Sequence, residues 1–112
     1  ENTHYTGIDP FPLREDILDV SIEELPRYQI SRSYDTVFML SALDNVKDLD
    51  KSLKGLKYSA DKNIVILTSI GVKPDTAHTV QVDRSDLVSV LGEPFQEVEV
   101  SPKLFLFEWR VK

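Results

Sequence analysis

The sequence predicts an α/β domain with a mostly parallel sheet and a C-terminal antiparallel hairpin. The first observation is an apolar run, Val37–Leu40, which gives way to leucine and valine residues at helical spacing. The second is another apolar run, Asn63–Ser69, which follows a connection long enough for a helix. The third is a pair of alternating segments at the end of the chain, Phe95–Val100 and Lys103–Val111. Unbroken apolar runs are typical of strands that are covered on both faces, as in a parallel sheet.

Length and composition limit the function classes. A chain of 112 residues forms one domain at most. Its net charge of −6 leaves no basic surface, so no nucleic-acid partner is indicated. The apolar runs are shorter than the roughly 18–20 residues that a membrane helix needs, so no membrane partner is expected. The chain has no cysteine, which is compatible with a reducing, cytoplasmic location.

The position of the methionine bears on where the chain begins. The only methionine is Met39, so residue 1 is not an initiator. We expect Glu1 to be either a processed start or, as the favoured reading, the cut end of a longer chain. Residues 1–112 are therefore expected to form a single, partial domain.

The N-terminal third predicts short elements. His4–Asp9 reads as a short strand that ends in an acid. Asp9 is open to two interpretations, a turn former before Pro10 or a carboxylate at the carboxyl tip of the strand. The following segments are predicted as one helical turn, a second short strand, a turn and a polar connection: Pro12–Asp16, Ile17–Ile22, Glu23–Pro26 and Arg27–Ser33.

The central stretch, Tyr34–Val46, predicts a strand, a short loop and the start of a helix. Ligands bind outside the carboxyl ends of strands in open α/β sheets, so the loop Ser41–Asn45 is the first place to expect function. Asp44 or Asn45 is predicted to cap a helix that runs to about Lys57, although Asp44 is equally suited to orient an acceptor group. An apolar stripe on this helix is interpreted as core packing: Leu43, Val46, Leu49, Leu53 and Leu56.

The second apolar strand is predicted to pair with the first. Lys57–Lys62 is predicted to be a polar turn that leads into Asn63–Ser69. We expect this strand to lie parallel and adjacent to Val37–Leu40, both as inner strands, because a helix connects them. Phe38 and Ile66 are then expected to be fully buried.

A long loop and a short helix follow. The loop Ile70–Val82 contains His78, which is either exposed to solvent or turned toward an acceptor substrate. His78 and His4 are the only histidines and lie far apart in the sequence, so no metal site is expected. A short helix is predicted over Ser85–Leu91, with Asp83 or Ser85 as its cap, an inward face of Leu87, Val90 and Leu91, and Gly92 as its end.

The order of these segments resembles that of class I S-adenosylmethionine-dependent methyltransferases, from their second strand onward. Gly7–Pro10 (GIDP) is similar to the acidic motif after the second strand of that fold. Ser21–Pro26 (SIEELP) is similar to the stretch after its third strand, and Tyr34–Val46 (YDTVFMLSALDNV) to its fourth strand and loop. The resemblance is closest to the small-molecule, type 11 group. It implies a Rossmann-like, methyltransferase-type sheet, truncated at the N-terminus.

The resemblance also implies roles for particular residues, with S-adenosylmethionine as the cofactor and a small molecule as the methyl acceptor. Asp9 would hold the ribose hydroxyls of the cofactor, and the segment after the third strand would border its adenine. The implied cofactor-binding residues are Asp9, Ser21, Ile22, Glu23 and Ser41. The implied substrate-facing residues are Asp44, Asn45 and His78. No catalytic residue is indicated.

The sequence also departs from the family pattern. The glycine-rich first strand and its loop are missing, since the chain has four glycines and no GxG cluster. Ser21 stands where an acid is usual, and Asn45 where a histidine is usual. We therefore expect full cofactor binding only in a more complete chain, and an exposed sheet edge that allows self-association. The alternative functions are a non-catalytic methyltransferase-like binding or structural module, or another α/β domain such as a nucleotide-binding one.

Overall fold

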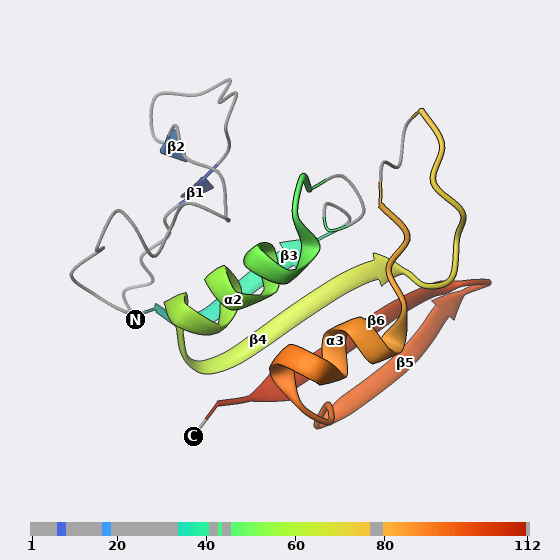
Figure 1. Cartoon of the computed structure of the whole chain (residues 1–112). Helices are drawn as coiled ribbons and strands as arrows, with labels where there is room; N and C mark the ends of the chain where they lie inside the picture. The colour runs from blue at the N-terminus through green and yellow to red at the C-terminus, as the bar shows by residue number, and fades with distance from the viewer. Residues whose placement is uncertain are drawn as a thin grey trace.

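A four-stranded mixed sheet with two helices on one face forms the main body of the protein (Figure 1). The computed structural model describes residues 7–8, 17–18, 34–40, 43, 46–76 and 80–111. The elements in chain order are β1 (Gly7–Ile8), β2 (Ile17–Leu18), β3 (Tyr34–Leu40), α2 (Leu49–Ser59), β4 (Ala60–Ser69), α3 (Arg84–Leu91), β5 (Gln96–Ser101) and β6 (Leu104–Arg110).

The order of strands in the main sheet is β3-β4-β6-β5. β3 and β4 are parallel and adjacent, with Val37 opposite Ile64 and Leu40 opposite Leu67, as the sequence predicts. β5 and β6 form the predicted antiparallel hairpin, and β6 pairs antiparallel with β4. The α/β fold class and the C-terminal hairpin are thus confirmed. Within the described sheet, however, β3 is an edge strand and not the inner strand that the sequence predicts.

Helix α2 connects the two parallel strands, but its ends differ from the predicted ones. The structure places the N-cap at Asp48, whose Oδ1 accepts a hydrogen bond from the Lys51 N–H at 3.1 Å. The predicted cap at Asp44 or Asn45 is therefore wrong, because the helix begins only at Leu49. The predicted polar turn at Lys57–Lys62 is also wrong, since β4 starts directly after α2.

The ends of α3 agree with the prediction. Asp83 is its N-cap, and the Asp83 N–H in turn donates to the Asp86 carboxylate at 2.9 Å, which completes a capping box. Gly92 ends the helix with φ +82°, a backbone conformation that glycine adopts without strain. The Gly92 carbonyl also accepts a hydrogen bond from Trp109 Nε1 at 2.8 Å, which ties the end of α3 to β6.

The core lies between the helices and one face of the sheet. Phe107 on β6 lies between Phe105 and Trp109, with ring centroids 5.9 and 5.5 Å away. Ile66 is fully buried, as predicted. The buried apolar residues of the described part are Leu43, Leu53, Leu56, Ala60, Ile64, Ile66, Val82, Leu87, Phe107 and Trp109.

The predicted burial of Phe38 is wrong, since its side chain is 60% exposed. Side chains alternate between the two faces of a strand, and Val37 and Met39 point to the face that packs on the core. Phe38 and Leu40 point to the opposite face. Both described helices lie on the core side of the sheet, so they leave this second face open (Figure 1). An apolar run by itself does not reveal which of its two faces is covered.

The two short strands near the N-terminus form a separate parallel pair. Gly7 lies opposite Ile17, and Ile8 lies opposite Leu18. They correspond to the predicted strands His4–Asp9 and Ile17–Ile22. Among the described residues, neither of them pairs with β3. No helix in the described part of the chain is long and apolar enough to cross a membrane.

Candidate functional site

The candidate site lies at the carboxyl ends of the parallel strands β3 and β4. Two parallel strands joined through a helix have their carboxyl ends on the same edge, and ligands of open α/β sheets bind there. β3 ends at Leu40 and β4 at Ser69, and the register between them continues to the pair Leu40 and Leu67. The segments that follow β3 and β4 therefore leave the sheet close to each other, at the carboxyl ends of these strands.

Two buried side chains hold this edge against the core. Leu43, three residues after β3, has no exposed surface, so the chain after β3 is anchored at that point. Thr68, the penultimate residue of β4, is 1% exposed, and its hydroxyl donates to the Ser69 carbonyl at 3.2 Å. The carboxyl ends of β3 and β4 are thus held against the core by buried side chains.

The loop after β4 is closed at its base. The Ile70 N–H donates to the Lys103 carbonyl at 2.8 Å, and the Gly71 N–H donates to the Val82 carbonyl at 2.8 Å. Gly71 has φ +69°, and a Cβ there would meet no atom within 4 Å, so backbone conformation rather than space favours glycine. Val82 is 1% exposed and anchors the returning chain. Loops fixed at their base on a rigid scaffold are common carriers of binding groups.

All eight of the predicted site residues lie outside the described residues. They are Asp9, Ser21, Ile22, Glu23, Ser41, Asp44, Asn45 and His78. The structure therefore tests neither their positions nor their roles. Sequence adjacency alone relates them to described elements: Asp9 follows β1, Ser41 follows β3, and His78 falls between the ends of the closed loop.

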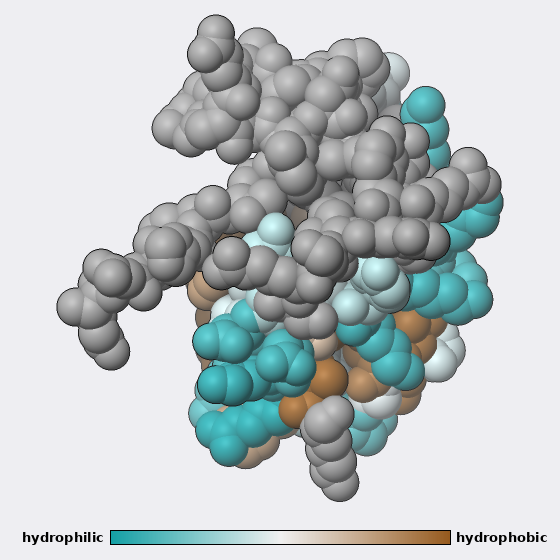
Figure 2. All heavy atoms as spheres, turned by 90° about the vertical axis from the view of Figure 1, so that its left-hand side faces the viewer, coloured by the Kyte–Doolittle hydropathy of each residue, from teal (hydrophilic) through white to brown (hydrophobic). Residues whose placement is uncertain are grey.

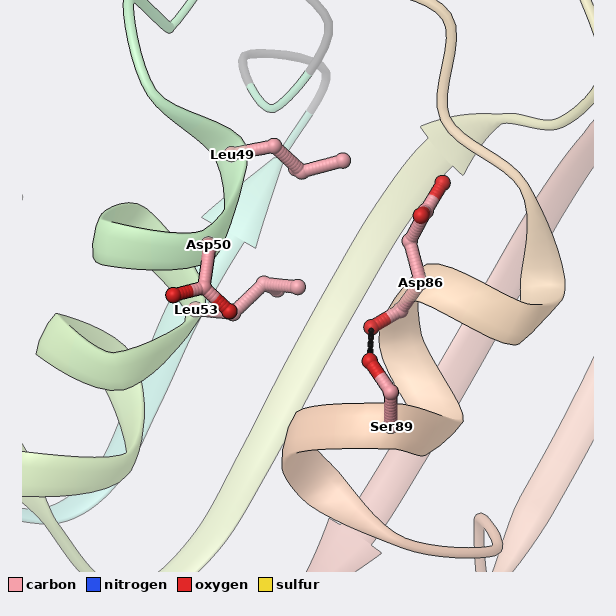
Figure 3. Close-up of a pocket in the computed structure, with 5 residues that line it drawn as sticks. All are labelled: Leu49, Asp50, Leu53, Asp86 and Ser89. Carbon is pink, nitrogen blue, oxygen red and sulfur yellow. Dashed lines mark hydrogen bonds between the residues drawn. The ribbon is translucent and has the colours of Figure 1, made fainter.

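One hollow of the described surface lies between the helices (Figure 3). Leu49 and Leu53 point from α2 toward α3, where Asp86 and Ser89 lie. The polar groups around it already have partners. Asp86 accepts from the Asp83 N–H, the Ser89 hydroxyl donates to the Asp86 carbonyl at 2.8 Å, and Asp50 pairs with Lys54 at 2.7 Å.

The hydrogen bond and the charge of Asp50 raise the pKa of Lys54 above its usual value. Asp50 therefore serves a helical ion pair and is not poised for a ligand. No three His, Cys, Asp or Glu side chains among the described residues are grouped to hold a metal ion. The hollow between the helices thus offers no free polar group in the part of the chain that is described.

A second hollow lies at the opposite end of β4 from the candidate site. It is lined by Lys57, Ile64, Leu91, Trp109, Arg110 and Val111. Figure 2 views the molecule from this end and shows hydrophobic residues surrounded by hydrophilic ones. Lys57 Nζ donates to the Val90 carbonyl at 3.3 Å, and the Arg110 guanidinium lies 3.7 Å from the centre of the Phe95 ring. The two cations of this hollow are thus engaged within the fold.

Comparison with known proteins identifies the fold. No protein-family model matches the sequence, and no curated protein sequence matches it. Solved structures do match over most of the chain, and three of them are described here. Magnesium protoporphyrin IX methyltransferase from Synechocystis PCC 6803 with bound S-adenosylmethionine has a TM-score of 0.62 and 15% identity, over 86% of this chain and 45% of that one. The same enzyme with bound S-adenosylhomocysteine has a TM-score of 0.64 and 16% identity, over 83% and 49%.

The third structure is the N-methyltransferase NodS from Bradyrhizobium japonicum WM9 with S-adenosylhomocysteine. Its TM-score is 0.59 and its identity 15%, over 94% of this chain and 65% of that one. At such identities the likeness concerns the fold, and it confirms the predicted methyltransferase-type architecture. The chain spans between 45% and 65% of the length of these structures.

Proposed function

We propose that this chain, which shares the fold of part of the S-adenosylmethionine-dependent methyltransferases, contributes to methyl transfer to a small-molecule acceptor in the cytoplasm. The observation that carries the proposal is the strand order β3-β4-β6-β5. In it, a parallel pair is extended by a hairpin whose second strand lies next to β4. This arrangement is unusual enough to be informative, because sequential strands usually become neighbours in chain order.

The cofactor side is assigned to residues that follow β1, β2 and β3. The register of Ile8 with Leu18 sets the carboxyl ends of β1 and β2 level with each other. Asp9 is the next residue after β1, and Ser21–Glu23 begin three residues after β2. A carboxylate accepts hydrogen bonds from two neighbouring ribose hydroxyls, and backbone groups of an extended segment read the edge of an adenine. The hydrogen-bonding groups that the sequence offers therefore suit the adenosine half of S-adenosylmethionine.

The acceptor side is assigned to Asp44, Asn45 and His78. Asp44 and Asn45 follow the anchored Leu43, and His78 belongs to the loop closed by Gly71 and Val82. The proteins with similar structures include a magnesium protoporphyrin IX methyltransferase, which supports a small molecule as the acceptor. The sulfonium of the cofactor supplies an activated methyl group when bound. The protein then has to align the acceptor with that methyl group and exclude water, which accounts for much of the rate gain.

The second candidate is a non-catalytic module with the same fold. The observation that favours it is the absence of any GxG cluster from the 112 residues, since backbone approach to the methionine end of the cofactor calls for glycine. Under this hypothesis Asp9 and Ser21–Glu23 bind no adenosine.

An amide NMR titration with S-adenosylhomocysteine distinguishes the two functions. We expect shifts of Ile8, Leu18 and Leu40 at the carboxyl ends of the strands, with a dissociation constant weaker than micromolar because the glycine loop is missing. Asp9→Asn should abolish the shifts. Asp35→Asn is the matched control, since Asp35 is an exposed acid near the amino end of β3.

Each result of the titration decides between the hypotheses. Shifts that are absent at the solubility limit of the ligand, or that survive Asp9→Asn, contradict the proposed site and favour the module. Calorimetry on the same samples tests the affinity. A micromolar or tighter dissociation constant would show that the cofactor site is complete within this chain.

A further inference from the structure

The turn between β5 and β6 lies at the carboxyl end of β4, beside the candidate site. Ser69, the last residue of β4, is opposite Leu104, the first residue of β6. The Ile70 N–H donates to the Lys103 carbonyl at 2.8 Å, so the chain that leaves β4 is attached to this turn. Figure 1 shows the turn next to the start of the loop after β4. The turn therefore borders the place where the parallel strands end.

Lys103 in this turn has a backbone conformation that lysine rarely adopts. Its φ is +65°, and it is the one residue other than glycine with a positive φ in the described part of the chain. Glycine or asparagine is the usual choice for such a position in a turn. Sparsely populated backbone conformations are concentrated at functional sites and ligand clamps. The conformation of Lys103 therefore suggests that its side chain is used.

Two hydrogen bonds hold the backbone of Lys103 in place. Its N–H donates to Glu99 Oε2 at 3.3 Å, which attaches it to β5, and its carbonyl accepts from the Ile70 N–H. The residue itself is exposed to solvent. A cation on a fixed backbone loses less conformational entropy when it binds an anion than a cation on a free loop does. Lys103 is therefore well placed to bind an anionic group.

The spacing of the strands relates this turn to the acceptor side of the candidate site. β6 is next to β4, and β4 is next to β3. Since neighbouring strands lie about 5 Å apart, the turn is about 5 Å from the end of β4 and about 10 Å from the end of β3. A small molecule that contacts the segment after β3 can therefore also reach Lys103. Lys73, three residues after Ile70, adds a second exposed cation to the segment that the turn holds.

We propose that Lys103 is a specificity-determining residue, whose ammonium binds a carboxylate of the methyl acceptor. This assignment rests on the proposed function, which places the acceptor at the carboxyl ends of β3 and β4. A carboxylate is favoured over a phosphate because the net charge of −6 on the chain repels a doubly charged group more strongly. The acceptor class is therefore a small organic acid.

Amide NMR titration of the whole chain with benzoate tests the proposal. Benzoate carries one negative charge, and benzamide is its neutral counterpart of the same shape. We expect benzoate to shift the amides of Ile70, Gly71 and Leu104, with a weak dissociation constant because exposed ion pairs stabilise little. Benzamide should leave these amides unshifted. Added salt should weaken the binding of benzoate, since it screens exposed charges.

Variants of Lys103 separate a role of its charge from a role in folding. Lys103→Gln should raise the dissociation constant for benzoate roughly two- to fivefold, the range expected for an exposed ion pair, and Lys103→Arg should restore binding. Lys103→Gly removes the charge and also suits the positive φ, so it should weaken binding without lowering the melting temperature. The matched control is Lys62→Gln, because Lys62 is an exposed lysine near the amino end of β4. This control should bind benzoate like the unsubstituted chain.

Several results would overturn the proposal. Benzamide could shift the same amides as strongly as benzoate, or Lys62→Gln could weaken binding as much as Lys103→Gln. Tighter binding of phenyl phosphate than of benzoate would contradict the assignment to a carboxylate.

The benzoate titration needs no cofactor, so its result is independent of the titration with S-adenosylhomocysteine. S-adenosylhomocysteine that binds through Asp9, together with no benzoate shifts, overturns the role of Lys103 and leaves the proposed function intact. Benzoate that binds to a chain without affinity for S-adenosylhomocysteine contradicts the proposed function. Lys103 would then be an anion-binding residue of a non-catalytic module, which overturns its role toward a methyl acceptor.

Discussion

At the scale of single residues, two phenylalanines of the same sheet have opposite environments. Phe107 is 1% exposed and lies between Phe105 and Trp109 on the helix-covered face. Phe38 is 60% exposed on the other face. The two side chains are chemically identical, so the difference in their contribution to stability comes from the helices that cover one face only.

Alanine substitutions at these two positions should differ widely in their effect on the free energy of unfolding. Phe107→Ala should lower the free energy of unfolding by about 3–5 kcal/mol, because it removes a fully buried aromatic ring and leaves a cavity. Phe38→Ala should change it by no more than about 0.5 kcal/mol in the monomer, as for most surface substitutions. Urea unfolding followed by the fluorescence of Trp109, the only tryptophan, measures both. Equal losses would mean that the helix-free face is covered in solution.

At the scale of an element, the start of helix α2 is determined by its N-cap rather than by its apolar stripe. Leu43 and Val46 belong to the stripe and pack against the core, yet the helix begins only at Leu49. The Asp48 side chain accepts from the Lys51 N–H, and the Asp48 carbonyl accepts from the Ser52 N–H. The apolar periodicity therefore extends beyond the helix, and the cap determines where the hydrogen-bonded turns begin.

The cap can be tested by substitution. Asp48→Ala should lower the free energy of unfolding by about 0.5–2 kcal/mol, since it leaves a helical N–H without its side-chain acceptor. Asp44→Ala is the matched control, because the sequence alone favours Asp44 or Asn45 as the cap. Thermal unfolding followed by circular dichroism measures the difference. A larger loss for Asp44→Ala than for Asp48→Ala would move the helix start toward residue 44.

At the scale of the whole molecule, polar contacts attach α3 to the hairpin. Arg84 Nη2 contacts Glu97 Oε1 at 2.7 Å and Glu93 Oε1 at 3.1 Å, and Arg84 Nε also donates to Glu97 at 3.2 Å. The hydrogen bonds from Arg84 lower the pKa of Glu97 below its ordinary value of 4.5. The Arg84 pKa rises because it donates to Glu97 and Glu93. These contacts connect the last helix to the outermost strand.

This ion pair predicts a dependence of stability on pH. Because the pKa of Glu97 is lower in the folded state, the pair contributes its full stabilisation above pH 4.5 and loses it as the pH falls through the folded pKa. Glu97→Gln should therefore reduce the acid-induced loss of unfolding free energy between about pH 5 and pH 3. The effect should be small and weaker in high salt, because the pair is exposed.

The neutral variant Arg84→Met provides the second arm of this experiment. It should remove the same part of the pH dependence as Glu97→Gln, and the double variant should add little to either. Urea titrations at a series of pH values measure all four proteins. If Glu97→Gln retains the acid dependence of the unsubstituted chain, the pair does not contribute to folding.

For the candidate site, the residues were proposed from the sequence, whereas the structure shows the strand ends and loop base next to them. Asp9, Ser41 and His78 came from motif order and position, and they stay predictions because they lie outside the described residues. The closed base of the loop between Gly71 and Val82 was not predictable. It depends on a backbone hydrogen bond between distant residues, which has no signature in local sequence.

Local sequence patterns were enough to predict which elements form and how the main strands pair. Periodicity, glycine and capping residues act over a few neighbouring positions, and these local signals correctly predicted β3, α2, β4, α3 and the hairpin. Only the packing of distant segments shows that β3 lies at an edge of the described sheet and that Phe38 is exposed. The physical reason is that an apolar run favours burial on both faces, whereas actual burial depends on which distant segments pack against each face.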